Sequence, residues 1–254
     1  MFTSNFLSAI KIILILFFIL SAKALSQNAT EIVKKADELM RAKSSYTELT
    51  MKIIKPNWTR EMSMKVWALE PDYALIYITS PARDKGTVTL KRKNEVWNWL
   101  PSAQKVIKIP PSMMLQSWMG SDFTNDDLVR ESSVINDYTH KIIGEEKIDG
   151  YDCYKIQLTP KPEADVVWSK IITWIAKDLY LQPLTEYYDE DNKIVKRFEG
   201  SDLKTMDGRK IFTHWEMIPL DKPGNKTVMD YTKIQFNIKI DESFFSEQNM
   251  KKVR

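Results

Sequence analysis

The feature that most constrains this chain is a period-two alternation of apolar and polar residues that recurs from residue 46 almost to the C-terminus. The stretch 60–69 is the clearest case, because its methionines, valine and alanine stand at even positions and most of its polar residues at odd ones. Successive side chains of a β-strand point to opposite faces. The alternation therefore predicts strands with one apolar face each.

Turn residues such as Asp149-Gly150 and Asp207-Gly208 divide this part of the chain into about thirteen short strands. The predicted strands are 46–54, 60–69, 73–79, 87–92, 95–100, 105–109, 139–147, 152–160, 170–176, 181–188, 193–198, 210–217 and 226–234. A sheet of this many strands must curl, and closure protects its edges. We expect one mainly β domain, built as a meandering antiparallel sheet that forms a barrel or half-barrel.

Two segments depart from the alternation. Between residues 31 and 45, apolar residues recur at spacings of three and four, which predicts one amphipathic helix near the N-terminus. Between Pro110 and Asn136 the strands stop, and a compact apolar cluster is followed by a polar, acidic stretch. We expect one or two short helices there, placed where they can cover the open side of the curled sheet.

The N-terminus has the layout of a secretory signal. Lys11 precedes the apolar run 12–20, and small residues with an Ala-x-Ala pattern follow at 21–24. The apolar run is too short to span a membrane, which takes about 20 residues. We expect residues 1–24 to be a signal peptide cleaved near Ala24, leaving residues 25–254 as a single periplasmic domain; an uncleaved N-terminal anchor is the alternative.

The charge and the scarce reactive residues exclude several classes of function. The net charge is +3, and loss of residues 1–24 removes Lys11 and Lys23, leaving +1, so nucleic-acid binding is not favoured. The chain has two histidines, His140 and His214, and one cysteine, with no zinc-ligand spacing. Its seven glycines form no phosphate-binding loop. We therefore expect no cofactor, no metal and no enzymatic activity, although a triad of distant residues stays open.

Soft and aromatic apolar residues stand out instead, since the chain holds twelve methionines and eight tryptophans. Methionine adapts to varied ligands and tryptophan offers large rigid apolar area. They form either an ordinary core or the lining of a ligand cavity. The candidate ligand-binding residues are Met62, Met64, Val66, Trp97, Trp99, Met113, Met114, Leu115, Trp118 and Met119.

A resemblance favours the cavity. The segments that carry it are Ser80–Thr87 (SPARDKGT), Trp97–Ser102 (WNWLPS), Ile109–Met114 (IPPSMM) and Trp118–Leu128 (WMGSDFTNDDL), with a looser match at 173–184. This series resembles the outer membrane lipoprotein-sorting protein family, in a divergent branch of the LolA-like superfamily that also includes LolB and the RseB N-terminal domain. The run from Met119 to Asp127 is its most specific part.

The resemblance implies a curved antiparallel half-barrel whose concave side is covered by helices. It also implies a hydrophobic cavity for the acyl chain of a lipoprotein or a free lipid, and as a partner an inner-membrane exporter of the resistance-nodulation-division type. No functional residue of the dedicated lipoprotein chaperone can be placed on this chain. The first hypothesis is thus a periplasmic carrier of acylated ligands. The alternative is an envelope-stress sensor or adaptor that binds a protein partner, and a lipid or glycan hydrolase using His140 or His214 comes third.

Overall fold

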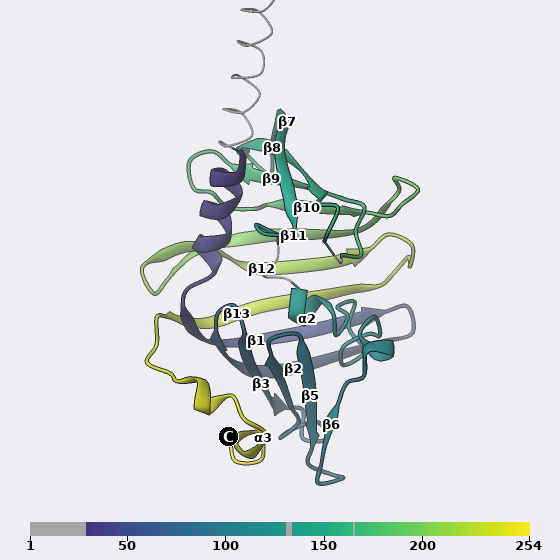
Figure 1. Cartoon of the computed structure of the whole chain (residues 1–254), viewed down its shortest axis with the longest axis vertical. Coiled ribbons are helices and arrows are strands. Elements are labelled where there is room, and N and C mark those ends of the chain that lie inside the picture. The colour runs from purple at the N-terminus through teal and green to yellow at the C-terminus, as the bar shows by residue number, and fades with distance from the viewer. Residues whose placement is uncertain (1–28, 131–133, 165) are drawn as a thin grey trace, which may run out of the picture.

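The computed structural model of the chain describes residues 29–130, 134–164 and 166–254, and Figure 1 shows them as one long, strongly curved sheet with few helices. The strands are β1 (Ser44–Lys55), β2 (Trp58–Leu69), β3 (Tyr73–Ser80), β4 (Val88–Arg92), β5 (Glu95–Leu100), β6 (Lys105–Lys108), β7 (Tyr138–Ile148), β8 (Tyr151–Pro160), β9 (Lys170–Ala176), β10 (Leu184–Tyr188), β11 (Ile194–Met206), β12 (Arg209–Pro219) and β13 (Lys226–Phe236). The predicted fold class is confirmed.

The order of the strands explains the shape. It reads β6-β5-β4-β3-β2-β1-β13-β12-β11-β10-β9-β8-β7, and every neighbouring pair is antiparallel. Each strand thus pairs with its neighbours in sequence, except that β6 does not pair with β7 and that β1 pairs with β13 in the middle. Strands β6 and β7 are the two free edges, so the sheet curves without closing and is a half-barrel.

Side chains alternate between the two faces along each strand, and directly opposed residues on neighbouring strands lie on the same face. Together they define an inner, concave face of the sheet. One row of directly opposed residues crosses this face from β8 to β1; its members are Ile156, Thr173, Thr185, Phe198, Met217, Thr227 and Ile53. Such cross-strand pairs are the units that stabilise a sheet. Because the row is continuous, residues far apart in the sequence face one common space.

The N-terminal helix, residues 29–40, covers one half of the concave face. Its buried residues Ala29, Ile32, Val33 and Ala36 pack in one cluster with inner-face residues of β8 and β9 such as Ile156. The helix stops at Met40, slightly before the predicted end. The C-terminal segment, with η3 (Glu242–Phe244) and α3 (Glu247–Met250), lies on the opposite, convex face instead.

The predicted signal peptide falls on residues 1–24, which lie outside the described residues, so it remains a prediction. Among the described residues, none of the helices is both long and apolar enough to cross a membrane.

Candidate functional site

The chain between the two edge strands must cross the open side of the half-barrel. Residues 109–130, which we name the crossing segment, leave β6 at one edge and lead toward β7 at the other. The segment contains η1 (Pro111–Met113) and the short helix α2 (Asp127–Arg130). In Figure 1 it lies in front of the middle strands. The described part of the interruption predicted between Pro110 and Asn136 therefore covers the concave face.

Two anchors hold the crossing segment on the inner face. The buried indole of Trp118 donates from Nε1 to Oγ1 of Thr89 on β4, at 3.1 Å. Asp122 pairs with Lys55 on β1 at 2.5 Å, and accepts a hydrogen bond from the Thr227 hydroxyl on β13 at 2.8 Å. The Asp122 carboxylate is almost fully buried, so these partners compensate a charge that would otherwise be costly to bury.

A third anchor joins α2 to β11. Thr124 and Asp127 exchange two hydrogen bonds at the start of α2: the Asp127 amide donates to the Thr124 hydroxyl, and the Thr124 amide donates to the Asp127 carboxylate. The same carboxylate accepts from the ammonium of Lys196, at 3.1 Å. Lys196 is buried and lies over the rings of Trp168 and Tyr187. This ion pair fixes the position of α2 above the sheet.

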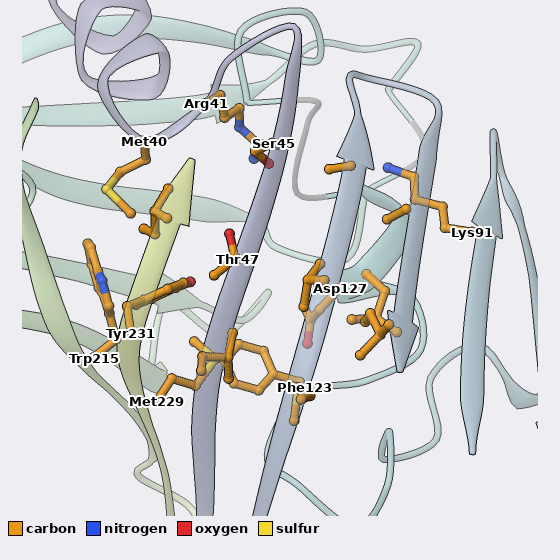
Figure 2. Close-up of a pocket in the computed structure, with 18 of the residues that line it drawn as sticks. Met40, Arg41, Ser45, Thr47, Lys91, Phe123, Asp127, Trp215, Met229 and Tyr231 are labelled. Atoms are coloured by element: carbon orange, nitrogen blue, oxygen red, sulfur yellow. The ribbon is translucent and has the colours of Figure 1, made fainter. Parts of the chain in front are cut away.

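Beneath the crossing segment lies a cavity of about 320 Å³, which we name the first chamber (Figure 2). Its apolar lining comes from the strands in the middle of the sheet, from the crossing segment and from the end of the N-terminal helix. The main lining residues are Met40, Leu49, Met51, Met64, Val66, Ala68, Ile76, Trp118, Phe123, Phe198, Trp215, Met229, Tyr231 and Ile234. A chamber of this size is typical of small-molecule sites.

The lining changes from polar to apolar along the strands. Ser45 and Thr47 of β1 are followed on the same face by Leu49 and Met51, and their opposite residues on β2 run from Ala68 to Met62. Figure 2 shows Arg41, Ser45 and Lys91 toward one end of the chamber, and Met229 with Phe123 toward the other, where the Asp127 side chain also lies. The chamber is therefore amphipathic along its length.

Charged groups close the polar end. Arg41 pairs with Asp37 at 2.7 Å and with Glu70 at 3.5 Å, and Lys91 donates to the Pro71 carbonyl at 2.9 Å. Burial raises the pKa of the Asp37 carboxyl, against the lowering effect of the Arg41 guanidinium. The polar end thus holds two acids and two bases, and both Arg41 and Lys91 have partners within the protein.

A second cavity, also of about 320 Å³ and named the second chamber, lies beside the first over the other half of the sheet. Its lining residues are Leu115, Phe123, Thr124, Asp126, Asp127, Val134, Tyr138, Val166, Val167, Trp168, Ile171, Tyr187, Lys196, Phe198 and Met217. Phe123, Asp127 and Phe198 line both chambers.

Five of the ten predicted ligand-binding residues lie at or under the chambers. Met64, Val66 and Trp118 line the first chamber, and Leu115 lines the second. Met62 is fully buried in the cluster beneath Trp118. Contact of these residues with a ligand remains a proposal.

The other five lie elsewhere. Trp97 and Trp99 are opposite Leu90 and Val88, and these pack with Phe245 on the convex face, away from the first chamber. Met114 packs on Val96 and Ile109, and Met113 is exposed at the end of η1. Met119 packs against the same buried cluster as Met62, but it lines an open hollow beside Trp58 and neither chamber. The structure thus separates residues that composition alone had grouped.

Sequence reasoning missed most of the lining from β1 and β13. Leu49 and Met51 stand at alternating positions of a predicted strand, so their shared face could have been found. Their meeting with Met229 and Tyr231 depends on the pairing of β1 with β13, which joins two distant parts of the chain. No local sequence pattern predicts the pairing of β1 with β13.

The groups considered for chemistry are engaged in structural contacts. His140 is buried, with Nδ1 3.1 Å from the Thr30 hydroxyl and Nε2 3.0 Å from the Val134 carbonyl, and burial lowers its pKa. His214 pairs with Asp230 at 2.6 Å. Cys153 is buried, and burial raises the pKa of its thiol. Within residues 29–130, 134–164 and 166–254, no three His, Cys, Asp or Glu side chains are grouped to hold a metal ion.

An open β half-barrel with a covered apolar cavity is the class that this geometry defines. The crystal structure of a DUF1329 family protein from Desulfovibrio piger is similar, with 26% identity and a TM-score of 0.80 over 89% of this chain and 99% of that one. Two further crystal structures share the fold. One is a putative outer membrane lipoprotein-sorting protein domain from Vibrio parahaemolyticus (20% identity, TM-score 0.77, 89% and 99% coverage); the other is a LolA superfamily protein from Nitrosomonas europaea (21%, 0.73, 87% and 98%).

A protein-family model described as "Uncharacterized protein" matches residues 70–252, well over half of the chain. The chain belongs to that family. The predicted resemblance to the LolA-like lipoprotein-sorting proteins is confirmed for the fold. No curated protein sequence matches this chain.

Proposed function

We propose that this chain is an exported periplasmic carrier that shelters the acyl part of a lipid or lipoprotein in the first chamber. The observation that carries the proposal is the chamber under the crossing segment, whose lining is mainly methionines, other apolar residues and aromatic rings, with the charged cluster around Arg41 at one end. An amphiphile has the same division between chain and head. The likeness in fold to lipoprotein-sorting proteins supports the same class of cargo.

The mechanism we propose is passive burial. Each CH₂ group moved out of water contributes about 0.8 kcal/mol, so an acyl chain in the chamber is held without any covalent step. The methionines Met51, Met64 and Met229 come from three different strands, and their flexible side chains can adapt to chains of different length. The crossing segment screens the bound chain from water.

The exporter partner remains a prediction of the resemblance, and the proposal concerns the cavity alone. The sensor or adaptor alternative would leave the chamber empty of lipid. The same experiment therefore separates the two functions.

Native mass spectrometry of the protein purified without detergent tests the proposal. We expect co-purifying lipid on the wild type and a loss of it in Val66→Trp, because the larger side chain fills the first chamber. Leu203→Trp is the matched control, since Leu203 is exposed on β11 and lines neither chamber. A wild type that carries no lipid and takes up none from vesicles would refute the carrier function.

A further inference from the structure

The open hollow beside Trp58, which we name the Trp58 hollow, has a volume of about 770 Å³. It lies at the end of the sheet where the turn between β1 and β2 meets the crossing segment (Figure 1). None of its lining residues lines either chamber. The lining includes Trp58, Arg60, Pro81, Arg83, Met119 and Gly120. Tryptophan and arginine are the residue types that contribute most to the binding energy of protein interfaces, so this composition is typical of an interaction site.

Two distant segments of the chain meet at the Trp58 hollow. One is Ser80–Thr87, which follows β3, and the other is Trp118–Leu128 of the crossing segment; both are among the stretches that carry the resemblance to lipoprotein-sorting proteins. Arg60 of β2 joins them, because its Nη1 donates to the Met119 carbonyl at 3.2 Å and its Nη2 pairs with Asp84 at 2.7 Å. The first chamber uses none of these contacts. A role in acyl binding therefore does not explain why the two segments meet here.

The two arginines of the hollow share one carboxylate. Asp84 pairs with Arg60 at 2.7 Å and with Nε of Arg83 at 3.2 Å. Burial acts to raise the pKa of the Asp84 carboxyl, but the hydrogen bonds from both arginines hold it below its usual value overall. Glu61 points to the other face of β2, where it stands opposite Lys52 of β1. One negative charge thus faces two positive charges, and the hollow keeps an excess of positive charge.

The accessible groups of the hollow suit a carboxylate with an apolar neighbour. The Arg83 side chain is 70% exposed and reaches Asp84 through Nε, so its Nη groups can donate to a second carboxylate. Trp58 is 47% exposed, and a Cβ atom built on Gly120 would lie 4.0 Å from its ring. The indole therefore rests on the backbone of the crossing segment and offers apolar surface at the rim.

We propose that the Trp58 hollow binds a loop of a partner protein that carries an aspartate or glutamate beside a large apolar side chain. The carboxylate of the partner accepts from the Nη groups of Arg83, and the apolar side chain packs against Trp58 and Met119. A concave site receives a protruding loop, whereas a planar lipid surface contacts protruding residues. The inference goes beyond the carrier function and does not depend on it, because the hollow lies outside both chambers.

Selection of a phage-displayed library of random peptides on the purified full chain tests the proposal. The recovered peptides should carry an acidic residue next to an aromatic or aliphatic one. In fluorescence polarisation, Arg83→Gln and Trp58→Ala should each weaken the binding of these peptides by about tenfold or more. Arg92→Gln is the matched control, since Arg92 is also an exposed arginine in a surface ion pair, with Glu242, and it should bind as the wild type does.

A charge reversal tests the direct contact. Arg83→Glu should lose the acidic peptide and should bind the same peptide after its acidic residue is replaced by lysine. The Arg83 and Trp58 side chains both reach the surface, so their variants should stay folded, which far-UV circular dichroism checks. Restored binding in the exchanged pair is not expected of a variant that has merely lost its structure.

The inference is overturned if the recovered peptides bind Arg83→Gln and Trp58→Ala as tightly as the wild type, or if no acidic peptide is recovered. It is also overturned if phosphatidylglycerol vesicles, and no peptide, bind in a way that depends on Arg83, because the hollow would then serve a lipid surface. None of these results bears on the co-purification of lipid, which tests the first chamber separately.

Discussion

The indole nitrogen of Trp118 lies 3.1 Å from the hydroxyl oxygen of Thr89, and this hydrogen bond ties the crossing segment to the inner face of β4. The Thr89 hydroxyl in turn donates to the Asn98 side chain on β5, at 2.7 Å. One buried hydroxyl thus links two strands and the segment that covers them. The roof of the first chamber depends on this link.

Thr89→Val should destabilise the protein by about 1–3 kcal/mol. The substitution keeps the shape of the side chain but leaves the buried Trp118 N–H without its acceptor, and an unsatisfied buried donor costs about that much. Urea unfolding followed by tryptophan fluorescence measures the change. Thr205→Val, at an exposed position of β11, should stay within about 0.5 kcal/mol. Equal losses of stability at both positions would show that this hydrogen bond does not stabilise the folded protein.

Lys196→Met should lower stability by about 1–3 kcal/mol, because it leaves the Asp127 carboxylate without the buried ammonium. The loss should be smaller than for a fully buried pair, since the Asp127 side chain keeps 24% of its surface exposed. Adding Asp127→Asn removes the orphaned charge, so the double variant should be more stable than Lys196→Met alone. A double-mutant cycle from chemical unfolding gives the coupling free energy, and strictly additive effects would argue against the ion pair.

Gly200→Ala should cost about 1–3 kcal/mol. A Cβ atom at this position would lie 2.8 Å from ring atoms of both Phe212 and Trp215. The Trp215 ring stacks on Phe198, which lines both chambers. Gly144→Ala is the control, because a Cβ there would have no neighbour within 4 Å. Thermal unfolding of the two variants compares them, and a Gly200→Ala variant as stable as Gly144→Ala would contradict this close packing around Gly200.

The contribution of His140 to stability should fall as the pH drops below about 6.5. Burial lowers the pKa of His140 in the folded state, so below the usual value of about 6.5 the unfolded chain binds a proton that the folded chain does not. The contribution is present above this pH and is lost as the pH falls through the folded value.

His140→Gln should therefore show a weaker pH dependence than the wild type between about pH 7 and pH 5. The comparison with the wild type is needed because His214 acts in the opposite direction: burial lowers its pKa, but the hydrogen bonds to Asp230 and Glu216 raise it above the usual value overall. Urea unfolding at several pH values measures both effects. An unchanged pH profile in His140→Gln would show that this side chain does not carry the dependence.

The strand pattern was readable from the sequence because alternation and turn residues are local signals, and β5 and β9 have the predicted bounds. Strand β11 is longer than predicted and reaches Met206. Its second half is almost entirely exposed, so it has no apolar alternation to detect. Gly200, just past the predicted end of this strand, is typical of a turn in sequence, although close packing against Phe212 and Trp215 is what requires it.

Only part of the candidate site could be predicted from the sequence. The crossing segment was found through its unusual composition, and Trp118 lies where a cavity lining was expected. The sequence could not predict whether Trp97 and Trp99 lie on the concave or the convex face. Alternation indicates which residues share a face, but it does not indicate which face is concave. That choice is made by the distant β1–β13 pairing and by the C-terminal segment, whose Phe245 and Met250 cover the convex side.

Mapping of a bound acyl chain by photo-crosslinking tests the central claim most directly. A fatty acid with a diazirine on its chain, bound to the purified protein and irradiated, should label chamber residues such as Met64 and Met229, identified by peptide mass spectrometry. Val66→Trp should reduce that labelling, and excess unlabelled lipid should compete with it. Labelling confined to the convex side, around Trp97 and Trp99, would contradict the assignment of the first chamber as the acyl-binding cavity.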